Sequence, residues 1–295
     1  MACVTSCSLL QVLTGHGNAR EALLVASLRG LIDASPGIEC QCQSRHPETS
    51  GQSVIDPLPD QSPRADWAVV LLAHGSADPR SPAAVQILAE RLSTRTGFLV
   101  IPAFLDHVSP RLRDAVERLA EQGVADIAVL PLLLASAFHV TVDVPEAIAN
   151  AEQSNYRILQ LAAIGHPAAV LTALLPPGPA PTVVVSAGTS VKVEREAFLN
   201  AVRDAAAATG RTAVGAFASG AGPTVADTVS ALRQQSNEPI NVLPWLVAPG
   251  VFSDRVAEQA AAVAATYVPV PGGLIAQSVM IEELERRIRA ATEPR

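Results

Sequence analysis

Two histidines stand where apolar runs of the sequence end, and their side chains are the ones best suited to chemistry. His74 follows the apolar run 67–73, and His139 ends the apolar stretch 127–138. Short apolar runs bounded by turn residues are typical of parallel strands that helices cover on both faces. Ligands of such sheets collect beyond the carboxyl ends of the strands. The two imidazoles are therefore well placed to hold a metal ion or to accept a proton.

A carboxylate is expected beside them. In the common doubly wound order the first strand lies between the second and third, about 4.8 Å from each. The second strand is expected over 98–104, and Asp106 follows it. His74, His139 and Asp106 would leave coordination positions open, which suits ferrous iron, cobalt or nickel. His107 is a competing ligand. The plainer alternatives are that each histidine is a turn or packing residue after its strand, and that Asp106 is a solvated loop carboxylate or caps a helix.

Strand and helix signals alternate along the chain from residue 67 onwards. Apolar runs predict strands, and Ser-Pro or Asp-Pro pairs predict helix starts. The strands are expected over 68–73, 98–104, 126–134 and 157–163, with helices over about 81–95, 109–122 and 144–153. This order predicts a parallel sheet with right-handed crossovers.

The pattern repeats after a proline-rich spacer at 175–181. Three short matches share one constant spacing: Ala103-Phe104 with Ala216-Phe217, Pro110 with Pro223, and Leu130-Pro131 with Leu243-Pro244. The letters around Ala73 match those around Ala187 at a spacing one position longer, which pairs His74 with Gly188. His139 pairs with Phe252 at the constant spacing. We therefore expect a duplicated α/β unit with one active centre, whose second copy closes the other side of a cleft.

The domain organisation follows from these signals. Residues 1–66 are expected to be an N-terminal extension and linker of unassigned role, because 45–66 are rich in proline, serine and glycine. Residues 67–175 are expected to form the domain with the active site, and 181–295 a degenerate copy. All four cysteines lie between Cys3 and Cys42, so neither core is expected to hold a disulfide, and their spacing gives no zinc motif.

Composition limits the partners. A net charge of −7 and an isoelectric point near 5.4 argue against binding to nucleic acid or an anionic membrane. The longest apolar stretch is shorter than the roughly 20 residues of a membrane-spanning helix, and residues 1–30 show no secretory pattern. We expect a soluble, cytoplasmic protein. A duplicated chain can complete its own cleft, so a monomer is expected.

The motifs themselves resemble those of a known family. His74-Gly75-Ser76-Ala77-Asp78-Pro79-Arg80, Ala103-Phe104-Leu105-Asp106 and the segment 138–145 resemble the sirohydrochlorin chelatases, the class II tetrapyrrole chelatases that include cobalt chelatases of cobalamin synthesis. Residues 181–270 resemble the degenerate second half of the long, two-domain form. The resemblance implies two flavodoxin-like halves that face each other across a cleft.

The resemblance also implies an activity. Ferrous iron would be inserted into sirohydrochlorin to make siroheme, or cobalt for cobalamin synthesis, with the divalent metal as substrate and neither an organic cofactor nor a nucleotide. On the family pattern His74 and His139 bind the metal and accept protons. The family usually has glutamate where this chain has Asp106, whose side chain is one methylene shorter.

An anionic macrocycle needs local positive charge in an acidic protein. Arg80, Arg111 and Arg113 follow strand ends on one rim, and Lys192 follows the first strand of the second half. Ser76 would also contact the substrate, or it would orient a histidine, as Asp143 would. Each of these could equally be an ordinary surface residue. The amphipathic segment 281–289 is expected to pack on the second half.

Of two other classes of function, a non-catalytic carrier remains open and a nucleotide or phosphate binder is disfavoured. A non-catalytic protein could carry a metal or tetrapyrrole in the same cleft. A nucleotide or phosphate binder would also fit a parallel sheet, but the first strand-to-helix loop has a single glycine and none of the glycine-rich phosphate motifs.

Overall fold

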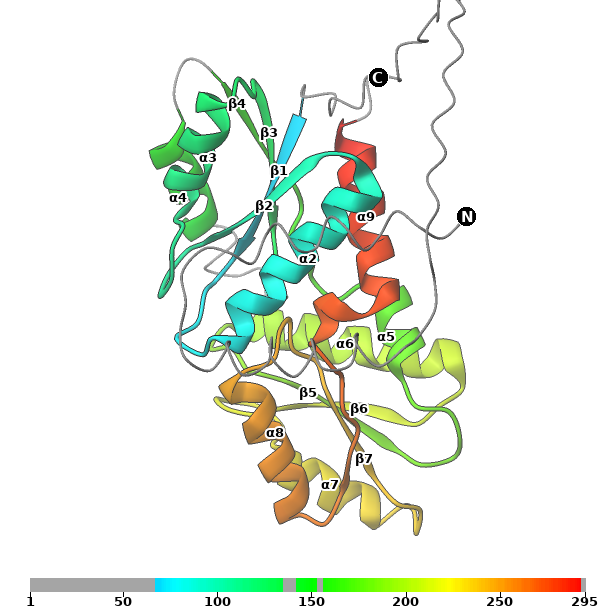
Figure 1. Cartoon of the computed structure of the whole chain (residues 1–295). Coiled ribbons are helices and arrows are strands. Elements are labelled where there is room, and N and C mark those ends of the chain that lie inside the picture. Colours follow the sequence, from blue (N-terminus) through cyan, green and yellow to red (C-terminus); the bar gives the residue numbers. More distant parts are fainter. Residues whose placement is uncertain (1–66, 135–141, 153–155, 293–295) are drawn as a thin grey trace, which may run out of the picture. The chain divides into compact units, whose positions relative to one another are not determined.

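The first parallel sheet carries the predicted strand order. The computed structural model describes residues 67–134, 142–152 and 156–292, all within one compact unit. Its first sheet has the order β2-β1-β3-β4 (Figure 1), built from β1 (Trp67–Ala73), β2 (Leu99–Phe104), β3 (Asp126–Pro131) and β4 (Arg157–Gln160). All neighbouring strands are parallel. The first strand thus lies between the second and third, as predicted.

The second sheet repeats this topology. Its order is β6-β5-β7-β8, built from β5 (Thr182–Ser186), β6 (Ala213–Phe217), β7 (Asn241–Pro244) and β8 (Thr266–Tyr267). Its strands are also parallel. The predicted fold class, two duplicated α/β halves with parallel sheets, is confirmed.

The strand register corrects one detail of the repeat. Ala73 pairs with Phe104 in the first sheet, and Ser186 pairs with Phe217 in the second. Because Phe104 and Phe217 are equivalent, Ala73 corresponds to Ser186, and one constant spacing relates the first three strands of each half. The spacing is six residues shorter between α4 (Val144–Ala151) and α8 (Val251–Ala262), and between β4 and β8. The longer spacing around His74 was wrong, since it followed a chance match of alanines. His74 therefore corresponds to Ala187, and Gly75 corresponds to Gly188.

Helices cover both faces of each sheet. They are α2 (Arg80–Thr96), α3 (Leu112–Glu121), α4 (Val144–Ala151), α5 (Ala168–Leu174), α6 (Lys192–Thr209), α7 (Val225–Arg233), α8 (Val251–Ala262), the short 3-10 helix η2 (Leu274–Ala276) and α9 (Ser278–Thr292). In β1 the side chains alternate: Val70 and Leu72 pack with the residues of α3, while Val69 and Leu71 pack with those of α2. This burial on both faces explains the unbroken apolar strand.

The sequence analysis expected the C-terminal helix to pack on the second half, and this expectation was wrong. α9 contacts α2, α5 and β3, so it covers the first sheet (Figure 1). Conversely α5, which follows the last strand of the first half, packs against α6 of the second half. The amphipathic pattern of 281–289 correctly predicts a buried face, but amphipathicity does not say which sheet buries it.

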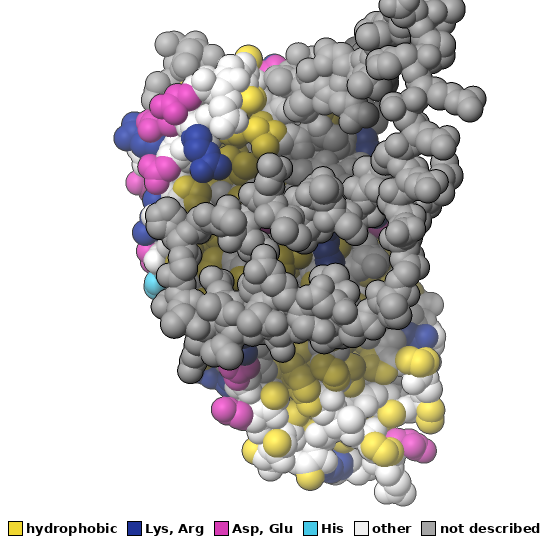
Figure 2. All heavy atoms as spheres, in the orientation of Figure 1, with side chains coloured by type: hydrophobic (Ala, Val, Ile, Leu, Met, Phe, Trp, Pro, Cys, Tyr) yellow, Lys and Arg dark blue, Asp and Glu magenta, His cyan; other side chains and the backbone are white. Residues whose placement is uncertain are grey.

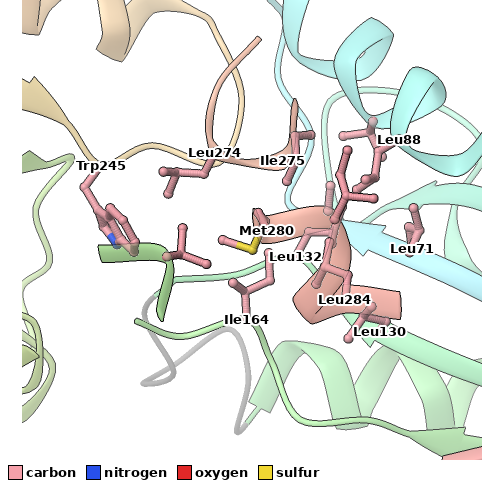
Figure 3. Close-up of a cluster of buried hydrophobic side chains, with 14 of the residues drawn as sticks. Leu71, Leu88, Leu130, Leu132, Ile164, Trp245, Leu274, Ile275, Met280 and Leu284 are labelled. Carbon is pink, nitrogen blue, oxygen red and sulfur yellow. The ribbon is translucent and has the colours of Figure 1, made fainter. Parts of the chain in front are cut away.

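This exchange of helices joins the halves through one core. Met280, Leu284 and Ile288 of α9 are completely buried and belong to the same apolar cluster as Leu71 and Leu130 of the first sheet (Figure 3). The cluster continues into the second half through residues such as Val184, Phe198 and Trp245. Each such side chain contributes about 1.5–3 kcal/mol on burial.

Surface charge agrees with the composition. Among the described residues visible in Figure 2, Lys and Arg side chains are interspersed with Asp and Glu, and neither sign gathers into a broad patch on that face. Among the described helices, none is both long enough and apolar enough to span a membrane.

Candidate active site

A cleft of about 540 Å³ lies where the carboxyl ends of β1 and β3 approach those of β5 and β7. Its polar wall includes His74, Ser76, Ser81, His107 and Ser186. Its apolar wall comes from both halves, with Val85, Leu132, Leu133 and Leu134 on one side and Trp245, Leu246, Val247, Ala248, Pro249, Val251 and Phe252 on the other. Small-molecule sites have this size and this mixture of many apolar and few polar groups.

His74 enters the cleft directly from the end of β1. Its side chain is half-buried, and its Nδ1 lies 3.3 Å from the carbonyl oxygen of Gly75. The ring of His107 faces it, with the two ring centroids 6.0 Å apart and the planes inclined by 38°. Metal–imidazole bonds are about 2.0–2.1 Å long, so both rings are within reach of a single ion.

His107 adopts a backbone conformation that histidine rarely takes. Its φ is +67°, in the left-handed region, and the amide of Val108 donates to the carbonyl of Asp106 across it, 2.8 Å away. The equivalent residue of the second half is Gly220, with φ +80°. Glycine takes this conformation at no steric cost, whereas other residues pay about 1–3 kcal/mol. A strained histidine at a glycine position on a cleft wall points to function.

Gly75 brings the two histidine loops together. The amide of Asp106 donates to the carbonyl of His74 at 2.7 Å, which ties the loop after β2 to the loop after β1. With φ +95°, a Cβ on Gly75 would lie 1.8 Å from the carbonyl oxygen of Asp106. Gly188 has the same role in the second half, where a Cβ would lie 2.1 Å from the oxygen of Ser219. Glycine is thus required at the crossing of the two loops.

Asp106 follows β2 but does not line the cleft. Its Oδ1 accepts from the backbone amide of His107 at 2.7 Å and lies 3.4 Å from Nη2 of Arg111. The hydrogen bond from the His107 amide and the nearby charges hold the pKa of the Asp106 carboxyl below its usual value. The structure therefore brings His107, the competing ligand, to the cleft beside His74, while the carboxylate of Asp106 is held by its neighbours.

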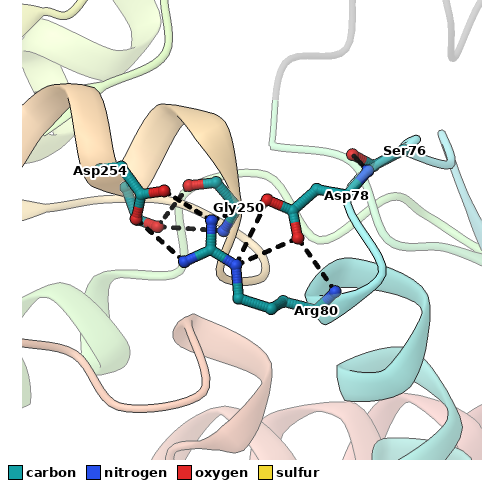
Figure 4. A network of polar contacts seen from close by, with 6 residues as sticks. Ser76, Asp78, Arg80, Gly250 and Asp254 are labelled. Atoms are coloured by element: carbon teal, nitrogen blue, oxygen red, sulfur yellow. Dashed lines mark hydrogen bonds and ion pairs between the residues drawn. The ribbon is translucent and has the colours of Figure 1, made fainter.

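Arg80 bridges the two halves. Its guanidinium donates to Asp78, with Nη2 2.7 Å from Oδ2, and to Asp254 of α8, with Nη1 3.0 Å from Oδ1 (Figure 4). Hydrogen bonds from Arg80 hold the pKa of both carboxyls below the usual range. Two carboxylates already occupy its donors, and Arg80 does not line the cleft.

The other predicted substrate-binding residues differ in position. Ser76 lines the cleft, and its Oγ accepts from the Asp78 amide at 3.1 Å. Arg111 lies at the start of α3, where it donates to the carbonyl of Leu105 and to Asp106. Arg113 and Lys192 are exposed and lie 3.5 and 3.6 Å from Glu117 and Glu196 on their own helices. None of these three cations is among the residues lining the cleft.

His139 lies outside the described residues, so its predicted role stays a prediction. Asp143, half-buried just before α4, does not line the cleft. Within the part of the chain that the structure describes, no three His, Cys, Asp or Glu side chains form a metal-binding group. The described geometry thus places two imidazoles on one wall of the cleft, and imidazoles can ligate an ion and accept protons.

From the sequence, His107 was named only as a competing ligand, and the place of Trp245 in the site was not recognised. The role of His107 could have been found in the repeat, because its counterpart at the constant spacing is a glycine, Gly220. Trp245 forms part of the cleft wall, and its Nε1 donates to Nδ1 of His166 at 3.0 Å. No local motif marks this contact, since 79 residues separate the pair.

Sequence comparison finds relatives with these motifs. A family model described as CbiX matches residues 68–175 and again 181–291. The sirohydrochlorin cobaltochelatase of Methanopyrus kandleri is 35% identical over 82 residues, which are 28% of this chain and 57% of the relative. The chain thus spans about three fifths of the length of the curated relatives it matches first.

Solved structures share the fold. SirB from Bacillus subtilis with Fe3+ superposes with a TM-score of 0.62 at 21% identity, over 76% of this chain and 94% of that chain. The sirohydrochlorin chelatase SirB from Bacillus subtilis subspecies spizizenii in complex with cobalt gives 0.57 at 20% identity, over the same shares. Because the family model covers both halves, the chain belongs to the CbiX family of class II chelatases, in agreement with the resemblance of its motifs.

Proposed function

We propose that this protein inserts a divalent metal ion into sirohydrochlorin. The observation that carries the proposal is the pair of facing imidazoles, His74 and His107, on the wall of a cleft whose other surfaces are mainly apolar. A tetrapyrrole is a flat, largely apolar ring with carboxylates at its periphery. Apolar walls suit the ring, and imidazoles suit the ion that enters its centre.

The reaction exchanges one divalent cation for two protons on the pyrrole nitrogens. The ion must first lose part of its water shell, and imidazole nitrogens can replace some of those waters. Imidazole ligands hold such ions less tightly than soft thiolates do, which suits a site that must release its metal. A neutral imidazole, with an ordinary pKa near 6.5, also accepts a pyrrole proton at neutral pH.

The family pattern assigns His139 to the same chemistry as His74, and this assignment remains part of the proposal. His139 and His107 would then act with His74 in delivering the ion and removing protons. Asp106 would support His107 through the backbone, because its carboxylate accepts from the His107 amide.

Two metal ions are candidates for the substrate. Ferrous iron is the metal we expected first from the resemblance, with siroheme as product. Cobalt is the alternative, and the names of the curated relatives, which are cobaltochelatases, support it. Imidazole ligands accept both ions, so metal availability and rates of insertion decide between them.

An anaerobic insertion assay tests the function. Metal-free sirohydrochlorin is mixed with the protein and with ferrous or cobaltous ion, and insertion is followed by the visible absorption of the macrocycle. We expect a rate proportional to protein concentration, and a loss of at least about 100-fold in a folded His74→Ala variant. Tight binding of sirohydrochlorin with no insertion of either metal would instead identify a non-catalytic carrier.

A further inference from the structure

The second half places an aromatic side chain on the wall of the cleft. Phe252, which the sequence pairs with His139 at a spacing of 113, lies in the first turn of α8 and lines the cleft. The helices α4 and α8 are 107 residues apart, so this pairing stays a sequence match only. Its side chain is 41% exposed. A large apolar side chain left exposed on the wall of a cleft is typical of a ligand contact.

An arginine lies over this ring. The Cζ of Arg255, one helical turn after Phe252, is 5.1 Å from the ring centroid, within the range of a cation–π contact. This contact holds the guanidinium beside a side chain that lines the cleft. Counted from the helix starts, the residue at the same place in α4 is Ile148, so this cation is particular to the second half.

Within the described part of the chain, Arg255 has no carboxylate partner, unlike Arg80 and Arg111. The neighbouring carboxylate of Asp254 is directed to Arg80, 3.0 Å away, and its charge is balanced there. The guanidinium of Arg255 therefore keeps donors for an external anion. A guanidinium binds a carboxylate through two parallel hydrogen bonds. Its N–H donors lie in its own plane, so they stay available when it stacks on an aromatic ring.

We propose that Phe252 and Arg255 form the substrate-binding wall of the cleft, in which Phe252 contacts the tetrapyrrole ring and Arg255 binds one of its peripheral carboxylates. This inference rests on the proposed substrate and deepens it. It divides the labour between the copies: the first half supplies the imidazoles, and the second half supplies an aromatic surface and a positive charge. Among the described residues, no arginine or lysine lines the cleft itself, and Arg255 lies beside it through the ring of Phe252.

The test measures binding without metal, so that it stands apart from catalysis. Metal-free sirohydrochlorin and its fully esterified form are titrated into wild-type protein and into Arg255→Gln. Arg118→Gln is the matched control, because Arg118 is an exposed arginine on α3, a helix that contributes no residue to the lining of the cleft. We expect Arg255→Gln to weaken binding of the free acid by about tenfold or more, as for one lost charge-assisted hydrogen bond, and to leave binding of the ester unchanged. Arg118→Gln is expected to change neither.

Two outcomes would overturn the inference. Wild-type affinity of Arg255→Gln for the free acid would show that this side chain does not bind the substrate. An equal loss for acid and ester would show that it acts through packing and not through charge. Phe252→Leu, in contrast, is expected to weaken both ligands, because the ring contact does not depend on the carboxylates. Should the wild type bind sirohydrochlorin in this way yet insert no metal, the inference would stand and the proposed chelatase activity would fail.

Discussion

At the scale of single residues, the backbone of His107 is the most informative feature of the site. Its φ of +67° places an imidazole opposite His74, whereas the second half has a relaxed glycine at the same point. Only side chains that gain something in function are expected to persist in such a conformation. The two copies thus act as an internal comparison between a working and a degenerate loop.

Substitutions at position 107 should separate stability from activity. His107→Gly should keep the free energy of unfolding within about 1 kcal/mol of the wild type, because relief of strain offsets the entropy of glycine. His107→Val should lose about 2 kcal/mol or more, because a β-branched residue is strained at positive φ. Urea unfolding measures both. Metal insertion should fall in both variants, and undiminished insertion by His107→Gly would remove His107 from the site.

Arg80 and Arg255 should differ in their effect on substrate affinity. Arg80 is bound by Asp78 and Asp254, so Arg80→Gln should raise the KM for sirohydrochlorin less than Arg255→Gln does. Steady-state kinetics at two salt concentrations measure this difference. A larger effect on KM from Arg80→Gln would instead support the substrate-binding role that the sequence analysis expected for Arg80.

At the scale of elements, the close crossing of two loops at Gly75 positions both described histidines. A Cβ at Gly75 would meet a backbone oxygen at 1.8 Å, while one at Gly97, which ends α2 at φ +79°, would meet nothing within 4 Å. The pair therefore separates the cost of positive φ from the cost of a clash.

Alanine substitutions test this difference. Gly97→Ala should lower the free energy of unfolding by about 1 kcal/mol, the ordinary cost of alanine at positive φ. Gly75→Ala should cost several times more and should also abolish metal insertion, because both histidine loops must move. Thermal unfolding and the insertion assay report the two effects. Equal costs at the two positions would contradict the proposed crossing.

The positions of the elements were largely predictable from the sequence. Apolar runs located the starts of β1 and β3 within a residue, and the first three strands lie in the predicted order. The strand expected to continue to residue 134 ends at Pro131, although the amide of Leu132 still donates to the carbonyl of Leu72 at 2.8 Å. Long-range contacts were not predictable. The partner of Arg80 on α8 and the sheet beneath α9 depend on segments from opposite halves of the chain.

At the scale of the whole molecule, a half-buried histidine links the two halves. His166, between β4 and α5, accepts from Trp245 of the second half. Burial lowers its pKa from 6.5 to about 4. The folded protein therefore keeps His166 neutral, while the unfolded chain takes up a proton below pH 6.5. This difference favours the unfolded state as the pH falls from about 6.5 to 4.

The pH dependence of stability tests this link. The wild type should lose up to about 3 kcal/mol through His166 over that interval, since each pKa unit corresponds to about 1.4 kcal/mol. His166→Gln keeps an acceptor for Trp245 but does not titrate, so it should lose less stability between pH 7 and 4. Urea unfolding at several pH values gives the difference between the two proteins. Identical pH profiles would show that His166 is protonated equally in both states.

The exchange of α5 and α9 has a consequence for how the chain can be divided. A cut in the spacer between α5 and β5 would leave α9, which covers the first sheet, on the second fragment. It would also separate α5 from α6, against which it packs. Neither fragment alone could bury its apolar surface, yet the two could reassemble without a covalent link. The molecule is thus a natural candidate for split-protein complementation, with restored metal insertion as the reporter of reassembly.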